Sequence, residues 1–159
     1  MTQGFDIAVV GTGPVGLLGA LAFASAGRRV ALVGPTPQAS DGRTAALLAP
    51  SVEFLRRLDL WPRLAHHAAP LRRMRIVDDT GGIFRPPPVE FTPEEVGLDV
   101  FGWNIENARL TAMLADAVRA NTAIIWQESL AVGFDAGEIA RLDLADGGLV
   151  EASLVVAAD

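Results

Sequence analysis

The sequence predicts an α/β fold in which a parallel layer at the N-terminus is joined to part of an antiparallel layer. The run from Asp6 to Val10 is short, apolar and rich in β-branched residues, as in a buried strand. A glycine-rich turn, a helix of small and apolar residues over 15–26 and a second apolar strand over 29–33 follow it. The second half of the chain instead alternates short apolar runs with turns, which indicates antiparallel strands.

The opening elements form one βαβ unit because strand, turn, helix and strand succeed each other within about 30 residues. Such crossovers are right-handed and their two strands are parallel. Gly27 stands at the position where a glycine commonly ends a helix.

The remaining elements are predicted from hydrophobic periodicity and turn residues. Helices are expected over 45–58, with a kink at Pro50, over 61–68 and over 104–120. A hairpin is expected over 75–84 with its turn at 79–82, and the three prolines at 86–88 exclude helix or central strand. Further strands are expected over 124–126, 130–134, 139–144 and 154–158.

Charge is distributed unevenly, and this excludes one class of partner. Ten arginines stand against six acidic residues up to Arg85, and three arginines against thirteen acidic residues after it. A nucleic-acid-binding surface is basic, so the acidic second half argues against general nucleic-acid binding. The chain has no cysteine, which excludes disulfides, thiolate nucleophiles and cysteine-ligated metals. The two histidines, His66 and His67, are neighbours and therefore a poor metal pair.

The turn at Gly11-Thr12-Gly13-Pro14-Val15-Gly16 fits the G-x-G-x-x-G pattern in the required context between a strand and a helix. The first glycine makes the tight turn, the second lets the backbone approach a pyrophosphate, and the third lets the helix pack closely on the sheet. Pro14 suits the first helical turn. These residues predict a Rossmann-like unit that binds a dinucleotide at the helix start.

One expected feature of such a unit is absent. The second strand ordinarily ends in Asp or Glu, whose carboxylate binds the ribose hydroxyls. This chain has Gly34-Pro35 there, and the next acidic residue along the chain is Asp41. The residue that takes over the ribose contact is left open by the sequence.

Three segments in order resemble one family: the glycine turn, the stretch Asp41-Gly42-Arg43-Thr44-Ala45-Ala46-Leu47, and the final strand 154–158 with Asp159. They resemble the FAD-dependent aromatic hydroxylases of the para-hydroxybenzoate hydroxylase type, in particular those of ubiquinone biosynthesis. The resemblance covers essentially the whole chain. It implies that residues 1–159 are an incomplete FAD-binding domain, with an inserted segment at 75–103 contributing to the layer that holds the substrate.

The resemblance also assigns candidate cofactor-binding residues beyond Gly11, Gly13, Pro14, Val15 and Gly16. Arg43 inherits a position near the flavin and pyrophosphate, although a solvated loop arginine is the simpler alternative. Asn107 and Arg109 begin the helix whose start touches the cofactor, although Asn107 also suits a helix cap. Asp159 matches the aspartate of an Asp-Gly motif involved in FAD and NAD(P)H binding. No side chain is assigned a catalytic role, and no metal site is expected.

The activity implied is that of a flavin-dependent monooxygenase, in which NAD(P)H reduces FAD and the cofactor then hydroxylates an aromatic or quinone-precursor substrate with O2. Family members are much longer, so this chain alone is expected to be inactive. Two alternatives stay open: a truncated, non-catalytic dinucleotide-binding module, and a fragment of an NAD(P)-dependent dehydrogenase. We expect a cytoplasmic protein; contact with a membrane surface and the oligomeric state are left open.

Overall fold

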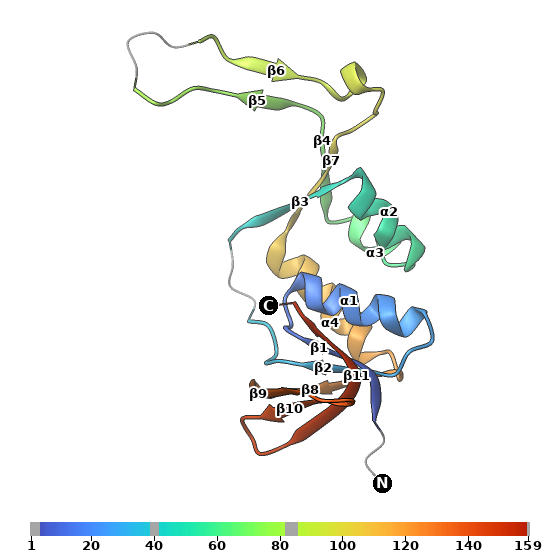
Figure 1. The fold of residues 1–159 in the computed structure, drawn as a ribbon. Coiled ribbons are helices and arrows are strands. Elements are labelled where there is room, and N and C mark those ends of the chain that lie inside the picture. Colours follow the sequence, from blue (N-terminus) through green and yellow to red (C-terminus); the bar gives the residue numbers. More distant parts are fainter. Residues whose placement is uncertain (1–3, 39–41, 82–85, 159) are drawn as a thin grey trace. The chain divides into compact units, whose positions relative to one another are not determined.

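The computed structural model describes residues 4–38, 42–81 and 86–158, which fall into two compact units. The first unit is discontinuous and combines Met1–Gly42 with Asn107–Asp159. The second unit, Arg43–Glu106, is one continuous stretch inserted between these two segments. Figure 1 labels the elements of both units.

The first unit holds the predicted βαβ motif. Its elements in chain order are β1 (Phe5–Val10), α1 (Pro14–Ser25), β2 (Val30–Val33), α4 (Asn107–Arg119), β8 (Ile124–Gln127), β9 (Ala131–Ala136), β10 (Ala140–Leu144) and β11 (Leu149–Ala157). The six strands of this unit form one sheet in the order β8-β2-β1-β11-β10-β9. The α/β fold class is therefore confirmed. Strands β8, β2, β1 and β11 are parallel, and β10 and β9 continue the same sheet with antiparallel pairing.

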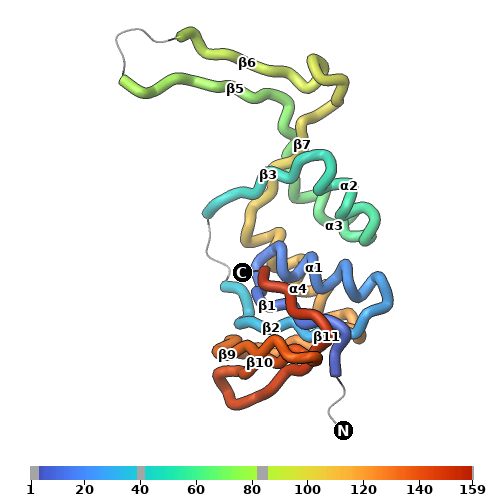
Figure 2. Tube along the Cα trace, viewed as in Figure 1, coloured from blue at the N-terminus to red at the C-terminus, as the bar shows by residue number. Residues whose placement is uncertain are grey.

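Strand β11 joins the two layers because it changes partner along its length. Its first residues pair antiparallel with β10, and Phe5 of β1 pairs parallel with Ala152 at the residue where Ala140 of β10 also pairs. From there to Ala157 the strand runs beside β1. Figure 2 shows the blue N-terminal strand next to the red C-terminal one, although nearly the whole chain separates them in sequence.

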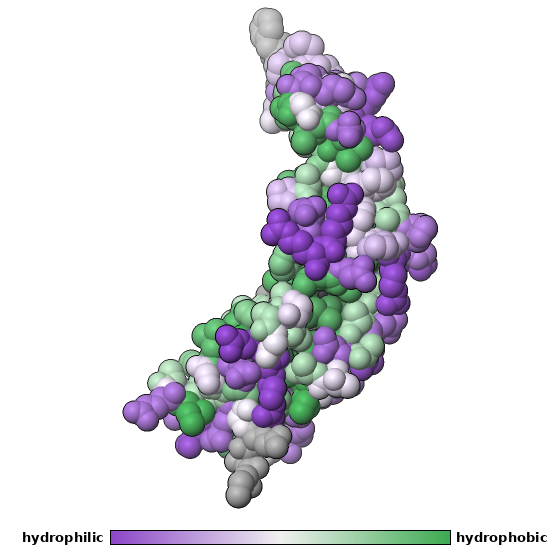
Figure 3. Space-filling model, turned by 90° about the vertical axis from the view of Figure 1, so that its right-hand side faces the viewer, coloured by the Kyte–Doolittle hydropathy of each residue, from purple (hydrophilic) through white to green (hydrophobic). Residues whose placement is uncertain are grey.

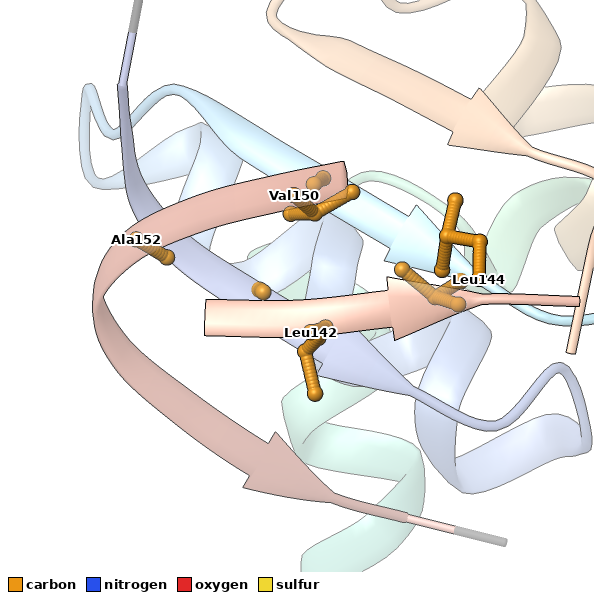
Figure 4. Close-up of a cluster of buried hydrophobic side chains, with 7 residues drawn as sticks. Leu142, Leu144, Val150 and Ala152 are labelled. Atoms are coloured by element: carbon orange, nitrogen blue, oxygen red, sulfur yellow. The ribbon is translucent and has the colours of Figure 1, made fainter. Parts of the chain in front are cut away.

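The core of the first unit lies on both faces of this sheet. Helices α1 and α4 pack against each other and against the parallel strands. On the other face, side chains of β1 and β2 form a buried cluster with those of β10 and β11; its members are Ala8, Ala31, Val33, Leu142, Leu144, Val150 and Ala152. Figure 4 shows this cluster, with β11 bent so that Val150 and Ala152 face it. Alternate residues along each strand thus fill two separate apolar layers.

The second unit is built on a small antiparallel sheet in the order β3-β7-β4 and a separate two-stranded hairpin of β5 and β6. Its elements are β3 (Thr44–Leu48), α2 (Ala49–Arg57), α3 (Trp61–Ala65), β4 (Ala68–Leu71), β5 (Met74–Ile76), β6 (Val89–Phe91), the 3-10 helix η1 (Pro93–Val96) and β7 (Gly102–Glu106). The Trp61 and Trp103 rings meet edge to face with centroids 5.5 Å apart, so both contribute to packing of this unit.

Two predicted helices begin later than the sequence suggested. Residues 45–48 of the predicted helix 45–58 form β3, which pairs with β7, and Pro50 lies in the first turn of α2 rather than at a kink. Likewise Asn104–Glu106 belong to β7, and the helix predicted from 104 begins at Asn107. Over three or four residues, an apolar pattern is compatible with both a strand and a helix. The antiparallel pairing between β3 and β7 makes these residues strands.

The predicted hairpin exists with a much longer connection. Ile76 pairs with Val89, so the second strand lies beyond the three prolines rather than before residue 84. Residues 82–85 lie outside the described part of the chain. Residues 86–88 are neither helix nor strand, as predicted.

Asp78 begins a local turn after β5. Its carboxylate accepts hydrogen bonds from the hydroxyl and the backbone N–H of Thr80, at 2.7 and 3.0 Å. This is the local pattern of an Asx turn. The Thr80 hydroxyl is the larger influence that lowers the pKa of the Asp78 carboxyl, followed by the Thr80 N–H.

Among the described residues, no helix combines the length and the apolar character that crossing a bilayer requires.

Candidate functional site

The glycine turn connects the end of β1 to the start of α1, as the sequence predicts. Gly11 has φ of 119° and its N–H donates to the Val33 carbonyl at 2.8 Å, which ties the turn to the end of β2. A positive φ is rare for any residue with a side chain, which explains a glycine at this position. Thr12 is buried, and its hydroxyl donates to the Pro35 carbonyl at 2.6 Å. The turn is therefore held rigidly against the second strand.

Gly16 and Gly13 are required for different reasons. A Cβ on Gly16 would lie 2.0 Å from the carbonyl oxygen of Gly11, so the helix could not pack this closely with any other residue. A Cβ on Gly13 would meet no protein atom within 4 Å. Gly16 is thus explained by the fold itself, whereas the fold gives no reason for a glycine at position 13. A ligand that approaches the backbone at Gly13 supplies such a reason.

The start of α1 suits an anion. The first hydrogen bond within the helix runs from the Leu17 N–H to the Gly13 carbonyl, at 3.0 Å. The N–H groups of Gly13, Val15 and Gly16 therefore have no acceptor within the helix, and Pro14 has no N–H. No side chain caps this end and its first turn holds no acidic residue. The positive end of the helix dipole is thus available to a diphosphate, and the residues present fit that group.

The other predicted cofactor-binding residues are distributed over both units. Asn107 and Arg109 lie in the first turn of α4, which packs on α1; Asn107 is half-buried and Arg109 is exposed. Arg43 is the first residue of the second unit and is exposed. Asp159 and Asp41 lie outside the described residues. The structure thus places Gly11 and Gly13 in the turn after β1 and Pro14, Val15 and Gly16 in the first turn of α1, and the roles of Arg43, Asn107 and Arg109 stay predictions.

A polar cluster that the sequence analysis did not identify lies at the carboxyl ends of β2 and β8. The Thr36 hydroxyl donates to the Glu128 carboxylate at 2.7 Å. Arg119 lies 4.0 Å from that carboxylate, and its guanidinium stacks over the Trp126 ring at 4.7 Å from the centroid. The Trp126 Nε1 donates to the Gly34 carbonyl at 2.9 Å. Thr36 and Glu128 are 92 residues apart, and only the order of the strands reveals their proximity.

The remaining candidates have structural explanations. His66 and His67 are exposed just after α3. Within the ranges 4–38, 42–81 and 86–158, no three histidine, cysteine or acidic side chains gather as metal ligands. Glu94 and Glu95 lie in η1, where Thr92 and Glu95 form a capping box at the start of this helix.

Comparison with known protein families matches residues 4–159 to the FAD-binding domain family. The chain belongs to this family. The strand, glycine turn and helix that form the candidate site are therefore those of an FAD-binding domain, and the cofactor expected from the sequence is supported at the level of the family. A search of curated proteins finds no match to the chain.

Solved structures show the same fold. The p-nitrophenol 4-monooxygenase PnpA from Pseudomonas putida DLL-E4 matches with a TM-score of 0.76 and 20% identity, over 100% of this chain and 41% of that one. The flavin-dependent monooxygenase PieE, solved with FAD and substrate, matches with a TM-score of 0.80 and 21% identity, over 99% of this chain and 30% of that one. The Diels-Alderase PyrE3 matches with a TM-score of 0.75 and 20% identity, over 96% and 32%.

This FAD-binding domain therefore spans about 30 to 41% of the length of these neighbours. Two of the three are named as monooxygenases and the third as a Diels-Alderase. Their common fold hence does not fix the reaction.

Proposed function

We propose that this chain is the FAD-binding portion of a flavin-dependent monooxygenase that hydroxylates an aromatic or quinone-precursor substrate, with O2 and NAD(P)H as co-substrates. The observation that carries the proposal is the glycine turn at residues 11–16, where the backbone at Gly13 is open and the helix start lacks any capping group. Two structural neighbours named as monooxygenases, one of them solved with FAD and substrate, favour this reaction.

The chain's own residues bind and orient the cofactor. The backbone N–H groups of Gly13, Val15 and Gly16 hold the pyrophosphate, and the positive end of α1 stabilises its charge. The hydrogen bond from the Thr12 hydroxyl to the Pro35 carbonyl keeps these donors in place before the ligand binds. When bound, the flavin supplies the redox chemistry with NAD(P)H and O2. Asn107 and Arg109 at the start of α4, Arg43 and Asp159 are proposed as further contacts.

The second unit has an apolar hollow that suits the binding of part of an aromatic substrate. It has a volume of about 340 Å³ and is lined mainly by hydrophobic side chains of β5, β6 and the segment after it, namely Met74, Ile76, Phe91, Val96 and Phe101. Exposed hydrophobic side chains are visible near the top of Figure 3, where β5 and β6 lie in Figure 1. We propose that this part of the segment 75–103 contributes to substrate binding.

Gly13→Ala tests the binding site directly. We expect the variant to stay folded and to lose no more than about 1 kcal/mol of stability, because the new Cβ meets no protein atom within 4 Å and alanine is only a poorer N-cap than glycine. We expect its affinity for FAD and for ADP to fall at least about tenfold, because the methyl group would block the close approach of a pyrophosphate to this backbone. Isothermal titration calorimetry measures both affinities.

The matched control is Gly19→Ala on the same helix, where an added Cβ also meets nothing within 4 Å. It should leave both affinities unchanged and stabilise the helix by about 1 kcal/mol. Equal affinities in the parent chain and Gly13→Ala would contradict the proposed site.

The visible spectrum of the purified chain adds a second measurement: flavin bands support retention of FAD, whereas a colourless chain that binds ADP supports the non-catalytic module.

A further inference from the structure

We propose that Glu128, at the end of β8, supplies the carboxylate that binds the adenosine ribose hydroxyls, in place of the acidic residue that is absent at the end of β2. The inference rests on the proposed function, since it concerns the adenosine part of the same cofactor. It assigns a binding residue that neither the glycine motif nor the family match identifies. All the residues that carry it belong to the first unit.

The end of β2 has no room for an acidic side chain. Gly34 has φ of 151°, a conformation that residues with a side chain rarely adopt. A Cβ at this position would lie 2.8 Å from the Cγ2 of Thr12, which is itself buried and hydrogen-bonded to Pro35. The absence of an acid at position 34 is therefore a requirement of how this chain packs its phosphate loop. The ribose-binding carboxylate has to come from another element.

Glu128 brings a carboxylate to the end of β2 from the neighbouring strand. β8 lies directly beside β2 in the sheet, and Val33 pairs with Gln127, the residue before Glu128. The two strand ends are joined by the hydrogen bond from the Gly34 N–H to the Gln127 carbonyl, at 3.1 Å. The Glu128 carboxylate accepts from Thr36, two residues beyond Gly34. Its oxygens therefore lie beside the segment where the side chain of a β2 acid would begin.

The surroundings of this carboxylate keep it oriented and leave it accessible. Arg119 lies 4.0 Å from Oε1 and is itself held over the Trp126 ring, so it acts as a positioning residue. The Glu128 side chain is 57% exposed, so it retains acceptor capacity for a ligand. Thr36 and Arg119 also line a hollow of about 120 Å³ between the segment after β2 and α4. Thr36 links this hollow to the carboxylate, because it both lines the hollow and donates to Glu128.

The proposed contact between Glu128 and the ribose is tested by removing the ribose hydroxyls and the carboxylate charge, separately and together. The full chain is titrated calorimetrically with ADP and with 2′,3′-dideoxy-ADP. We expect the parent chain to bind ADP about tenfold to a hundredfold more tightly, since hydrogen bonds to a charged group contribute that much. Glu128→Gln should bind both nucleotides with the affinity that the parent chain has for the dideoxy form. The amide oxygen of glutamine can still accept from Thr36, and the position is exposed, so the variant is expected to fold.

Asp116→Asn is the matched control, because Asp116 is a carboxylate that lines the hollow beside Thr36 and Arg119. It should retain the preference for ADP. A preference that survives in Glu128→Gln, or that disappears in Asp116→Asn, overturns the inference while leaving the proposed function intact. A parent chain that binds neither nucleotide overturns the proposed function, and the inference with it.

Discussion

Gly16→Ala is expected to lower the free energy of unfolding by about 3 kcal/mol or more. The new Cβ would lie 2.0 Å from the Gly11 carbonyl oxygen and 2.8 Å from its carbonyl carbon. Both are backbone atoms, so relief requires α1 to move away from β1 or the turn to open. Either movement displaces the N–H groups that face the pyrophosphate, so FAD binding should be lost as well. Urea unfolding followed by circular dichroism measures the first effect, and calorimetry the second.

The same substitution at Gly19 provides the comparison, since it lies about one turn further along α1 and its added Cβ meets nothing. The two variants have the same composition and the same change in intrinsic helix propensity. The difference between their free energies of unfolding therefore measures the cost of placing a Cβ between the helix and the turn. If Gly16→Ala were as stable as Gly19→Ala and bound FAD normally, the packing described for this loop would be incorrect.

Gly34→Asp is expected to destabilise the chain by about 2 kcal/mol and to give no gain in FAD affinity, although it restores the acidic residue of the usual motif. The backbone at this position has φ of 151°, and the Cβ would be 2.8 Å from the Thr12 Cγ2. The strain falls on the turn that holds Gly11 and Thr12, so the affinity for ADP should decrease. Urea unfolding and calorimetry again provide the measurements.

Gly137→Asp introduces the same charge in the turn between β9 and β10, where an added Cβ has only an ordinary contact, 3.5 Å from the Ile139 carbonyl oxygen. It should change neither stability nor affinity by a measurable amount. A tighter complex of Gly34→Asp with ADP would show that position 34 tolerates the acid, and would remove the reason for seeking the carboxylate on β8.

The sequence predicts the first unit well because its signals are local. Gly11, Gly13 and Gly16 belong to one motif in which each glycine has a defined mechanical role. The turn after Leu144 is local as well, since Asp146 and Gly148 are typical turn residues, and the Gly148 N–H donates to the Asp146 carboxylate at 3.0 Å. Such features depend on neighbours in the chain, and the structure confirms their positions.

The second unit is predicted less well because its elements depend on distant partners. Ala45–Leu48 have the composition of a helix, yet Leu47 pairs with Trp103 in the β3-β7 ladder. Gly102 allows this ladder to form tightly, since a Cβ there would lie 2.2 Å from the Leu47 carbonyl oxygen. Pairing between segments so far apart in the chain overrides local propensity. The Thr36–Glu128 contact could not be predicted for the same reason.

The pairing of β1 with β11 has a consequence for synthesis of the chain on the ribosome. The first strand completed during translation remains without one of its two neighbours until residues 149–157 have left the exit tunnel. The inserted unit, being continuous, can fold in the interval. Nascent chains arrested before residue 149 should therefore expose the apolar edge of β1 and associate with chaperones, and chains released from the ribosome should not.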